Sequence, residues 1–384
     1  MRNKLKKIFI LVNDPIFVYQ HLLPILDTLK KQTQIYIITA YNKKFNLDFE
    51  NIKIINIPIK RAPNFIDIYA LFKFFFIRLL YDPDICLSFT PKAGLINSLT
   101  RIQGSRSLHY FTGQRWADLK GTSRYLLKLV DKLIIFTCYR TYCDSSSQAK
   151  FIAKELKTNS VGILGKGSIS GVNMDKFNIK KEIALNELRK SKISNSLNLL
   201  SILEKTCSKK IKLICFVGRV NKDKGIRELI AGFKLHNKIF KDSYLLIIGP
   251  NELNNKDSQT IKNLKNCIYI DYFKNINLIL PFAYCLILPS YREGFGSVLI
   301  EAAASKVPII ASDIPGPKDF IDHMKNGYLI KPKDSIEIKN ALNFYRENNK
   351  LLKTFSENAY QKCIKYFSER YVCNLFKKEI LRNI

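Results

Sequence analysis

Apolar and polar positions follow two alternating patterns along the chain. Short runs rich in Ile, Leu, Val and aromatic residues are separated by stretches in which apolar residues recur at helical spacing. The first series of runs predicts strands at 7–13, 34–40, 53–59, 85–90, 107–112 and 140–145. Runs that are apolar on both faces and alternate with helices are typical of parallel βαβ units.

A second series of apolar runs begins after residue 210. It predicts strands at 212–220, 244–250, 267–272, 285–290, 308–313 and 327–330. Residues 173–210 are highly charged and helical in pattern, which indicates an inter-domain connection. The chain is therefore predicted to be an α/β protein with two Rossmann-like, doubly wound parallel-sheet domains. We place them at 1–172 and 211–366, with a C-terminal helix at 367–384 that packs back on the N-terminal domain.

Ligands bind to such sheets at the carboxyl ends of the strands. With two such domains facing one another, the cleft between them is the predicted site. The chain of 384 residues is long enough for both domains.

The chain is strongly basic, with 63 Lys and Arg against 32 Asp and Glu and a formal net charge of +31. The excess is spread over both halves. Such a charge favours anionic partners, which are nucleic acid, anionic lipid headgroups or phosphorylated substrates.

The nine cysteines include no CxxC pair. We interpret them as reduced thiols of a cytoplasmic protein, and not as a disulfide framework or a zinc site. The first apolar run, Ile8 to Val12, is too short for a secretion signal, and no run of about 18 apolar residues indicates a membrane span.

A basic loop follows the first strand of the second domain. The strand in "CFVGRVNKDKGIRELIAGF" ends at Gly218, and Arg219, Lys222 and Lys224 precede a predicted helix. Cations beside a helix N-terminus suit a diphosphate. A solvated basic turn is the alternative.

The segment "SYREGFGSVLIEAAASKVPIIASDIPG" carries two acids, Glu293 and Glu301, around a glycine pair. Glycines allow a ligand to approach the backbone closely, and carboxylates accept hydrogen bonds from vicinal hydroxyls. We expect Glu293 near a sugar and Glu301 near a ribose. Amides facing phosphate or sugar oxygens are expected at Gly294, Phe295, Gly296 and Ser297. A capped helix with a buried ion pair would explain Glu301 but not the glycine pair.

This segment resembles the E-x7-E region of the retaining glycosyltransferases of family four, which have the GT-B fold. "FVGRVNKDKG", "NGYLIKPKD" and "GKGSISGVNMDKF" resemble further stretches of that family. "VNDPIFVYQHLLPI", "SFTPKAGLINSL" and "HYFTGQRWA" are similar to members that build bacterial surface polysaccharides such as capsule and O-antigen.

The resemblance implies a nucleotide-sugar-binding C-terminal domain and an acceptor-side N-terminal domain. The donor diphosphate would be held by Gly218, Arg219 and Lys224, and the donor sugar by Glu293. Thr112 and Gly113 stand where a number of relatives place a catalytic histidine, so His109 is the histidine proposed instead. The catalytic residues expected are Glu293, Arg219, Lys224 and His109.

Acceptor-binding candidates follow the strands of the N-terminal domain. Lys92 starts a helix in "TPKAG" and Arg115 lies in "TGQRWA", and both cations suit an acceptor pyrophosphate. Ordinary surface cations are the alternative for both. The expected acceptor-binding set is His21, Lys92, Thr112, Gly113 and Arg115.

Asp82 and Asp84 in "YDPDI" superficially match a DxD metal motif. They precede a buried strand, at its amino end, whereas the chemistry of such sheets lies at the carboxyl end. We therefore expect no metal and no other cofactor, with cations and helix dipoles neutralising the leaving diphosphate.

Two stretches, 64–81 and 121–140, mix long apolar and aromatic residues with Lys and Arg. Either is suited to an interfacial helix on an anionic leaflet, and buried core helices are the alternative. With the high charge, this favours a cytoplasmic protein attached to the inner face of the cell membrane.

The predicted function is transfer of a hexose or N-acetylhexosamine from a nucleotide-sugar donor, expected to be UDP-linked, to a lipid-pyrophosphate-linked saccharide. One rival is a nucleotide-sugar 2-epimerase of the same fold. Another is a basic nucleic-acid-binding protein, which needs a clustered basic face, whereas the charge here is dispersed.

Overall fold

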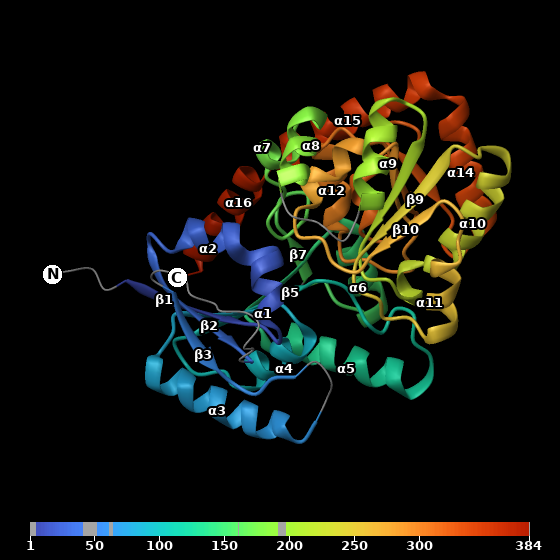
Figure 1. Cartoon of the computed structure of the whole chain (residues 1–384). Helices are drawn as coiled ribbons and strands as arrows, with labels where there is room; N and C mark the ends of the chain where they lie inside the picture. The colour runs from blue at the N-terminus through green and yellow to red at the C-terminus, as the bar shows by residue number, and fades with distance from the viewer. Residues whose placement is uncertain (1–4, 41–51, 61–63, 160, 191–196, 384) are drawn as a thin grey trace. The chain divides into compact units, whose positions relative to one another are not determined.

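The chain forms two compact units in a computed structural model that describes residues 5–40, 52–60, 64–159, 161–190 and 197–383 (Figure 1). Unit 1 comprises Met1–Gly171 together with Glu369–Ile384, and unit 2 comprises Val172–Ser368. The segment 173–210, expected as a connection, lies within unit 2, and its residues 191–196 are outside the described ranges.

Unit 1 is built on a seven-stranded parallel sheet in the order β3-β2-β1-β4-β5-β6-β7. The strands are β1 (Lys6–Leu11), β2 (Thr33–Thr39), β3 (Ile52–Asn56), β4 (Ile85–Ser88), β5 (Arg106–Phe111), β6 (Arg140–Cys143) and β7 (Val161–Ile163). Sequence pattern located the first six. It missed β7, which has only three residues and a glycine at its centre.

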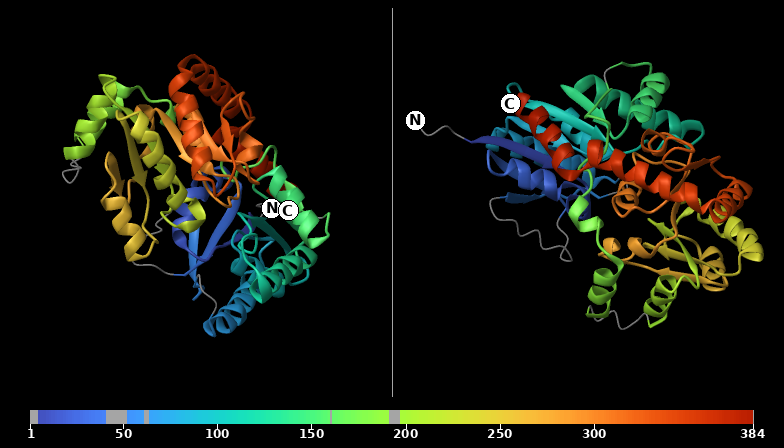
Figure 2. Two further views of the ribbon diagram at one scale, coloured as in Figure 1. Left: turned by 90° about the vertical axis from the view of Figure 1, so that its right-hand side faces the viewer. Right: turned by 90° about the horizontal axis from the view of Figure 1, so that it is seen from above.

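Helices cover both faces of this sheet. One face carries α2 (Leu23–Leu29) and α16 (Glu369–Arg382), and the other carries α3 (Ile66–Tyr81), α4 (Pro91–Leu99) and α5 (Gly121–Thr137). The remaining helices are α1 (Pro15–Phe17), a π-helical turn η1 (Val18–Leu22) and α6 (Ser146–Leu156). The last helix of the chain, α16, runs beside α2 (Figure 1; Figure 2). Its Glu379 accepts a 2.5 Å hydrogen bond from the Tyr142 hydroxyl on β6.

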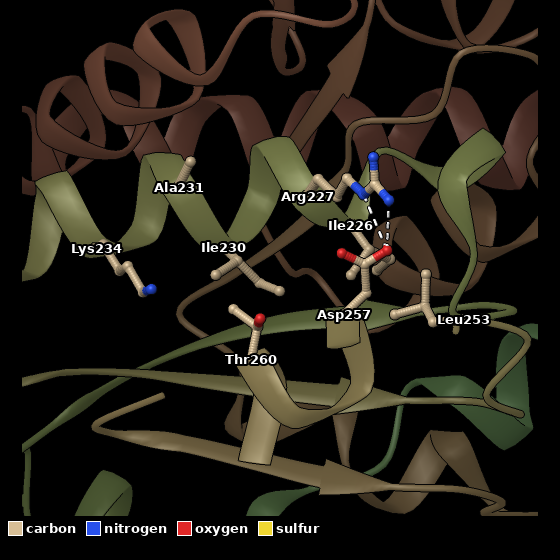
Figure 3. A pocket seen from close by; sticks show the side chains of 8 residues that line it. All are labelled: Ile226, Arg227, Ile230, Ala231, Lys234, Leu253, Asp257 and Thr260. Atoms are coloured by element: carbon tan, nitrogen blue, oxygen red, sulfur yellow. Dashed lines mark hydrogen bonds and ion pairs between the residues drawn. The ribbon is translucent and has the colours of Figure 1, made fainter. Parts of the chain in front are cut away.

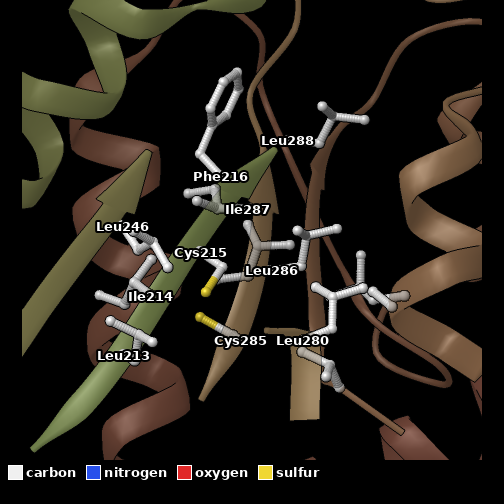
Figure 4. Packing of buried hydrophobic residues seen from close by; sticks show 14 of the residues in the cluster. Leu213, Ile214, Cys215, Phe216, Leu246, Leu280, Cys285, Leu286, Ile287 and Leu288 are labelled. Atoms are coloured by element: carbon white, nitrogen blue, oxygen red, sulfur yellow. The ribbon is translucent and has the colours of Figure 1, made fainter. Parts of the chain in front are cut away.

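Unit 2 is built on a six-stranded parallel sheet in the order β10-β9-β8-β11-β12-β13. The strands are β8 (Lys212–Val217), β9 (Ser243–Ile248), β10 (Cys267–Ile270), β11 (Cys285–Leu288), β12 (Ile309–Ser312) and β13 (Tyr328–Ile330). Adjacent strands β8 and β11 pack fully buried side chains such as Leu213, Cys215, Cys285 and Leu286 at the centre of the core (Figure 4).

The helices of unit 2 lie on both faces of its sheet. They are α7 (Met174–Phe177), α8 (Lys181–Lys190), α9 (Leu197–Cys207), α10 (Ile226–Ile239), α11 (Asn255–Lys262), α12 (Ser297–Ala304), α13 (Pro317–Phe320), α14 (Ser335–Glu347) and α15 (Asn349–Phe367). Short 3-10 turns occur at η2 (Lys222–Lys224), η3 (Ile276–Leu278) and η4 (Leu280–Phe282). None of the helices in the described ranges is long and apolar enough to cross a membrane.

Both sheets confirm the prediction of two doubly wound parallel-sheet domains. In each, the chain starts at a central strand, runs to one edge and then continues on the other side of the starting strand. The order reverses between β1 and β4 in unit 1 and between β8 and β11 in unit 2. Ligands of open α/β sheets bind outside the carboxyl ends of the strands at this reversal. The fold therefore fixes one candidate edge in each unit.

Gly232 allows α10 and α14 to pack closely. A Cβ atom at Gly232 would lie 2.6 Å from Ile338 Cγ2 and 2.7 Å from the Ser335 carbonyl oxygen. We expect Gly232→Ala to lower the free energy of unfolding by about 1–3 kcal/mol, because overpacking outweighs the gain in helix propensity. Urea unfolding checks this. The exposed Lys238→Ala on the same helix is the control and should stay within about 0.5 kcal/mol of wild type; a Gly232→Ala variant as stable as this control would contradict the packing argument.

Candidate functional site

An ion pair joins the two loops at the reversal of the unit 2 sheet. Lys224 Nζ, in the turn after β8, lies 2.5 Å from Glu293 Oε1, in the loop after β11. The Ser290 hydroxyl donates a 2.7 Å hydrogen bond to the same carboxylate oxygen. Both charged side chains are largely buried, with 17% and 10% of their surface exposed. The structure therefore brings together the basic loop and the first acid of the E-x7-E segment.

Three further contacts hold these loops in register, and sequence analysis did not anticipate them. The Tyr291 amide donates to the Asp223 carbonyl oxygen at 2.8 Å. The Arg292 guanidinium donates to Asp223 Oδ2 through Nε at 3.1 Å and Nη2 at 2.5 Å. Because Asp223 precedes Lys224 and Arg292 precedes Glu293, this second ion pair positions the first.

Glycines make the loops meet. Gly225 has φ +68°, and a Cβ atom there would lie 2.1 Å from the Pro289 carbonyl oxygen. A Cβ atom at Gly249, after β9, would lie 2.0 Å from the carbonyl oxygen of Gly218. No other residue fits such approaches without moving the backbone. At this edge the loops therefore approach one another through their backbones. Gly249 was not singled out from sequence, although its place directly after a strand was a usable signal.

Arg219 is paired with an acid of its own, Glu252. Its Nη1 atom lies 3.0 and 3.2 Å from the two carboxylate oxygens of Glu252, and Asn221 Nδ2 donates to Glu252 at 2.7 Å. This pair is more exposed, with 38% and 37% of the two side chains accessible. Glu252 was missed because it lies in a polar loop after β9, with no motif to mark it.

The start of α12 follows the glycine pair as predicted from sequence. Gly296 adopts φ +88° immediately before Ser297, the first helical residue. The Phe295 ring is buried and lies 5.1 Å from the ring of Phe367, centroid to centroid. Phe295 therefore anchors the loop through its side chain, and only its backbone faces the edge of the sheet.

Glu301 lies in the second turn of α12. No hydrogen bond or ion pair of its carboxylate is present among the described residues. The residue keeps some exposed surface, yet crowding by protein atoms desolvates the carboxyl group and raises its pKa to about 7, with a partly opposing effect of the Lys176 charge. Sequence analysis did not identify Lys176. A buried acid without a partner is costly, and a ligand hydroxyl would satisfy it.

The unit 1 candidates lie after three adjacent strands, β1, β4 and β5. Lys92, at the start of α4, pairs with Asp67 at 2.7 Å. The Thr112 hydroxyl donates to the Phe89 carbonyl oxygen at 3.4 Å, beside Gly113. Arg115 is exposed in the same loop. These positions share one edge of the sheet, and their acceptor role stays a prediction.

The two histidines of unit 1 differ in access. His21 lies in the π-helical turn η1, and burial lowers its pKa to about 4. His109 is fully buried between β5 and α4, where its Nδ1 atom lies 2.9 Å from the Ser88 hydroxyl. Burial also lowers the pKa of His109 to about 3. The ring has no access to a substrate in this position, so the structure does not support His109 as a catalytic residue.

The DxD-like pair lies at the amino end of β4, as expected. Asp84 accepts hydrogen bonds from the Lys7 amide at 2.8 Å and from Lys6 Nζ at 3.0 Å. Asp82 caps the end of α3 in a left-handed conformation. Their contacts are those of a turn before a strand.

A separate cavity of about 210 Å³ lies between α10 and α11 (Figure 3). The Arg227–Asp257 ion pair closes one end of it, and Ile230, Ala231 and Thr260 line its walls. No predicted donor-binding residue lines this cavity.

The raised pKa of Glu301 predicts a pH-dependent cost to stability. The folded-state pKa is about 7 against an ordinary value of 4.5, so the folded protein loses stability as pH rises between these values. We expect Glu301→Gln to be more stable than wild type by about 1–2 kcal/mol at pH 8, after allowance for partial exposure. The difference should shrink toward pH 5, where the folded wild type keeps the proton. Urea unfolding at both pH values measures it; an equal difference at both would show that the carboxyl group does not titrate near pH 7.

Comparisons with known proteins identify the fold and the class of activity. Residues 203–362, all within unit 2, match the family described as "Glycosyl transferases group 1". The chain is 28% identical over 359 residues to the capsular polysaccharide biosynthesis glycosyltransferase CapM of Staphylococcus aureus, covering 89% of this chain and 88% of CapM. It is 30% identical over 142 residues, 36% of each chain, to the UDP-Gal:alpha-D-GlcNAc-diphosphoundecaprenol alpha-1,3-galactosyltransferase of Escherichia coli.

Among solved structures, sucrose-phosphate synthase of Thermosynechococcus elongatus superposes with a TM-score of 0.79 at 16% identity, covering 98% of both chains. This likeness shows the GT-B fold. The group 1 match and the glycosyltransferase relatives identify the activity class. The chain is a transferase enzyme, a glycosyltransferase of GT-B fold whose residues 203–362 match the group 1 family.

Proposed function

We propose that this glycosyltransferase moves a hexose or N-acetylhexosamine from a UDP-linked donor to a saccharide on a lipid pyrophosphate, with retention of the anomeric configuration. It acts in bacterial surface polysaccharide synthesis, at the inner face of the cell membrane. The observation that carries the proposal is the Lys224–Glu293 ion pair at the carboxyl ends of the unit 2 strands. It joins a basic loop suited to phosphate to a carboxylate suited to sugar hydroxyl groups.

The donor diphosphate meets cations that are already paired. Lys224 is held by Glu293, and Arg219 is held by Glu252. A diphosphate carries more negative charge than a carboxylate and offers more acceptor oxygens, so it competes for both cations. Backbone amides from Gly294 to Ser297 add donors beside the start of α12. These groups stabilise the charge that develops as the diphosphate leaves.

The two acids would then take the hydroxyl groups of the donor. Once phosphate engages Lys224, Glu293 accepts hydrogen bonds from the sugar, while Ser290 keeps the carboxylate oriented at 2.7 Å. Glu301, whose carboxylate has no hydrogen bond or ion pair among the described residues, accepts from the ribose. Its pKa of about 7 makes this acceptance stronger as pH rises, because the ionised form is the better acceptor.

In this proposal the protein forms no covalent bond with the sugar. Oxocarbenium character develops at the sugar while the diphosphate departs, and we assign the role of nucleophile to none of the described side chains at the unit 2 edge. In this proposal Arg219, Lys224 and the backbone amides neutralise the leaving group without a metal. The acceptor follows from the Escherichia coli relative, whose name specifies a diphosphoundecaprenol-linked sugar. Lys92 and Arg115 supply the cations for the acceptor pyrophosphate.

A screen of nucleotide sugars by thermal shift, followed by turnover of the best binder on a polyprenyl-pyrophosphate saccharide, tests the function. Transfer with retained configuration is the expected result. Turnover of donor alone into its C2 epimer would indicate an epimerase. Salt-sensitive binding to duplex DNA without any nucleotide-sugar binding would indicate a nucleic-acid-binding protein.

Glu293→Gln should lower kcat by roughly a hundredfold, because it removes the charged acceptor beside the reacting sugar. The measurement is the initial rate of sugar transfer at saturating donor, with urea unfolding to verify the fold. The exposed Glu347→Gln in unit 2 is the control and should retain wild-type rates. Turnover of Glu293→Gln within a few-fold of wild type would refute the role.

Arg292→Gln should raise the donor KM by about tenfold and affect kcat less, because Arg292 positions the Lys224 and Glu293 loops without touching the donor. Asp223→Asn should have the same effect, and the double variant should be no worse than either single one. The nearby Arg227–Asp257 pair has similar geometry, with Nε and Nη2 both bonded to Asp257 Oδ2. Arg227→Gln is therefore the matched control, and an equal rise in KM for this variant would show a non-specific loss of charge.

A further inference from the structure

The outward surface of α3 is a continuous apolar stripe. Phe65, Tyr69, Phe72, Phe76 and Leu80 recur at intervals of three or four residues, so they lie on one side of the helix. Phe65 is 93% exposed, Phe76 64% and Leu80 80%. Soluble surfaces seldom expose large apolar side chains in such a contiguous row, and a row of this kind marks an interaction site.

This stripe is not a core face of the described structure, because the opposite side of α3 already packs on the sheet. Ala70 and Phe74 are fully buried there. Arg78 is also fully buried, and its guanidinium donates to Ser105 Oγ and Ser107 Oγ, both at 3.0 Å, and to the Asn97 carbonyl oxygen at 3.2 Å. The helix is therefore apolar on the side that faces solvent as well as on the side that faces the core.

A second stripe occurs on α5, on the same face of the unit 1 sheet. Its members are Tyr125, Leu126, Leu129, Leu133 and Phe136, and Phe136 is 87% exposed. Helix α4 packs against both α3 and α5, so the two stripes belong to one layer of three helices (Figure 1).

The charges on α3 and α5 indicate the chemistry of the partner. Each helix carries one acid. Asp67 on α3 is paired with Lys92, and Asp131 on α5 is buried and accepts a 2.7 Å hydrogen bond from Trp116. Lys73 lies beside the α3 stripe, with Nζ 5.9 Å from the centre of the Tyr69 ring, and Lys132 is exposed beside the α5 stripe. Apolar and aromatic rows bordered by cations, on a chain of net charge +31, match an anionic lipid surface.

We propose that the stripes of α3 and α5 together form the surface through which this protein docks on an anionic bilayer. The aromatic and leucine side chains enter the interface between headgroups and acyl chains, while Lys73 and Lys132 contact the anionic headgroups. The proposal deepens the membrane location in the proposed function by naming the docking surface and the lipid chemistry. It is independent of which sugar is transferred.

The test uses the full chain and sedimentation with vesicles of phosphatidylcholine mixed with phosphatidylglycerol, compared with vesicles of pure phosphatidylcholine. The α3 variant is Phe72→Ser/Phe76→Ser, and the α5 variant is Leu129→Ser/Phe136→Ser. The control removes exposed apolar groups from unit 2, as Ile239→Ser/Ile336→Ser, at residues that are 58% and 52% exposed.

Wild type and the control should bind the mixed vesicles, and each stripe variant should bind roughly tenfold more weakly or worse. Binding to pure phosphatidylcholine, and binding in high salt, should be weaker than to the mixed vesicles. Wild-type vesicle binding by both stripe variants would overturn the proposal. So would self-association of the wild type, measured by analytical ultracentrifugation without vesicles and abolished in the stripe variants, since a second copy would then cover the stripes.

Folding and donor binding are measured separately, so that the two proposals fail separately. Each stripe variant should unfold cooperatively in urea and keep the wild-type thermal shift with UDP. Loss of vesicle binding with donor binding intact supports the docking surface even if no sugar transfer is found. If the wild type and the stripe variants all fail to bind UDP, but the wild type binds vesicles and the variants do not, the donor site proposal fails and the docking surface stands.

Discussion

The ion pair between Lys224 and Glu293 is the interaction on which the candidate site depends. It spans the point where the strand order of unit 2 reverses, because one partner follows β8 and the other follows β11. A largely buried pair of this kind gains little net stability over apolar packing, since desolvation offsets much of the attraction. Its importance lies in the positions that it gives to the two side chains. In the proposed function, Lys224 would bind phosphate and Glu293 would bind hydroxyl groups, and the ion pair keeps the two side chains within one hydrogen bond of each other until a ligand separates them.

Backbone contact makes that arrangement possible. The loops can approach closely only because Gly225 and Gly249 lack side chains where a Cβ would strike the carbonyl oxygens of Pro289 and Gly218. The Arg292–Asp223 pair then fixes the loops laterally. Glycines set the distance between the loops, and a surface ion pair sets their register. A single apolar or bulky substitution at either glycine would separate groups that lie nearly 70 residues apart in the chain.

The sequence predicted the parts of the structure that depend on local pattern. Twelve of the strands were located because each is an apolar run bounded by polar residues, and the loop at Glu293 was recognised from its glycine pair. What it could not supply were partners distant in sequence. Glu252 and Lys176 lie in polar segments with no periodicity, and only the fold brings them to Arg219 and Glu301. His109 shows the opposite case. A histidine near the end of a strand looks accessible in sequence, but alternation along β5 turns its ring under α4.

The two surfaces of α3 show how a helix can stay anchored and still leave apolar groups exposed. Its inward face is held by Phe74 and by the Arg78 hydrogen bonds to Asn97, Ser105 and Ser107. These bonds link the helix to α4, to the residue before β5 and to β5 itself. No acid pairs with Arg78 in these contacts, so neutral acceptors fixed by the fold offset only part of its cost of burial, and its Nε atom has no hydrogen-bond partner among the described residues. An anchor made of specific hydrogen bonds does not slide or rotate as a purely apolar contact can. The outward phenylalanines cannot turn into the core, and the same constraint that secures the helix keeps their row facing outward.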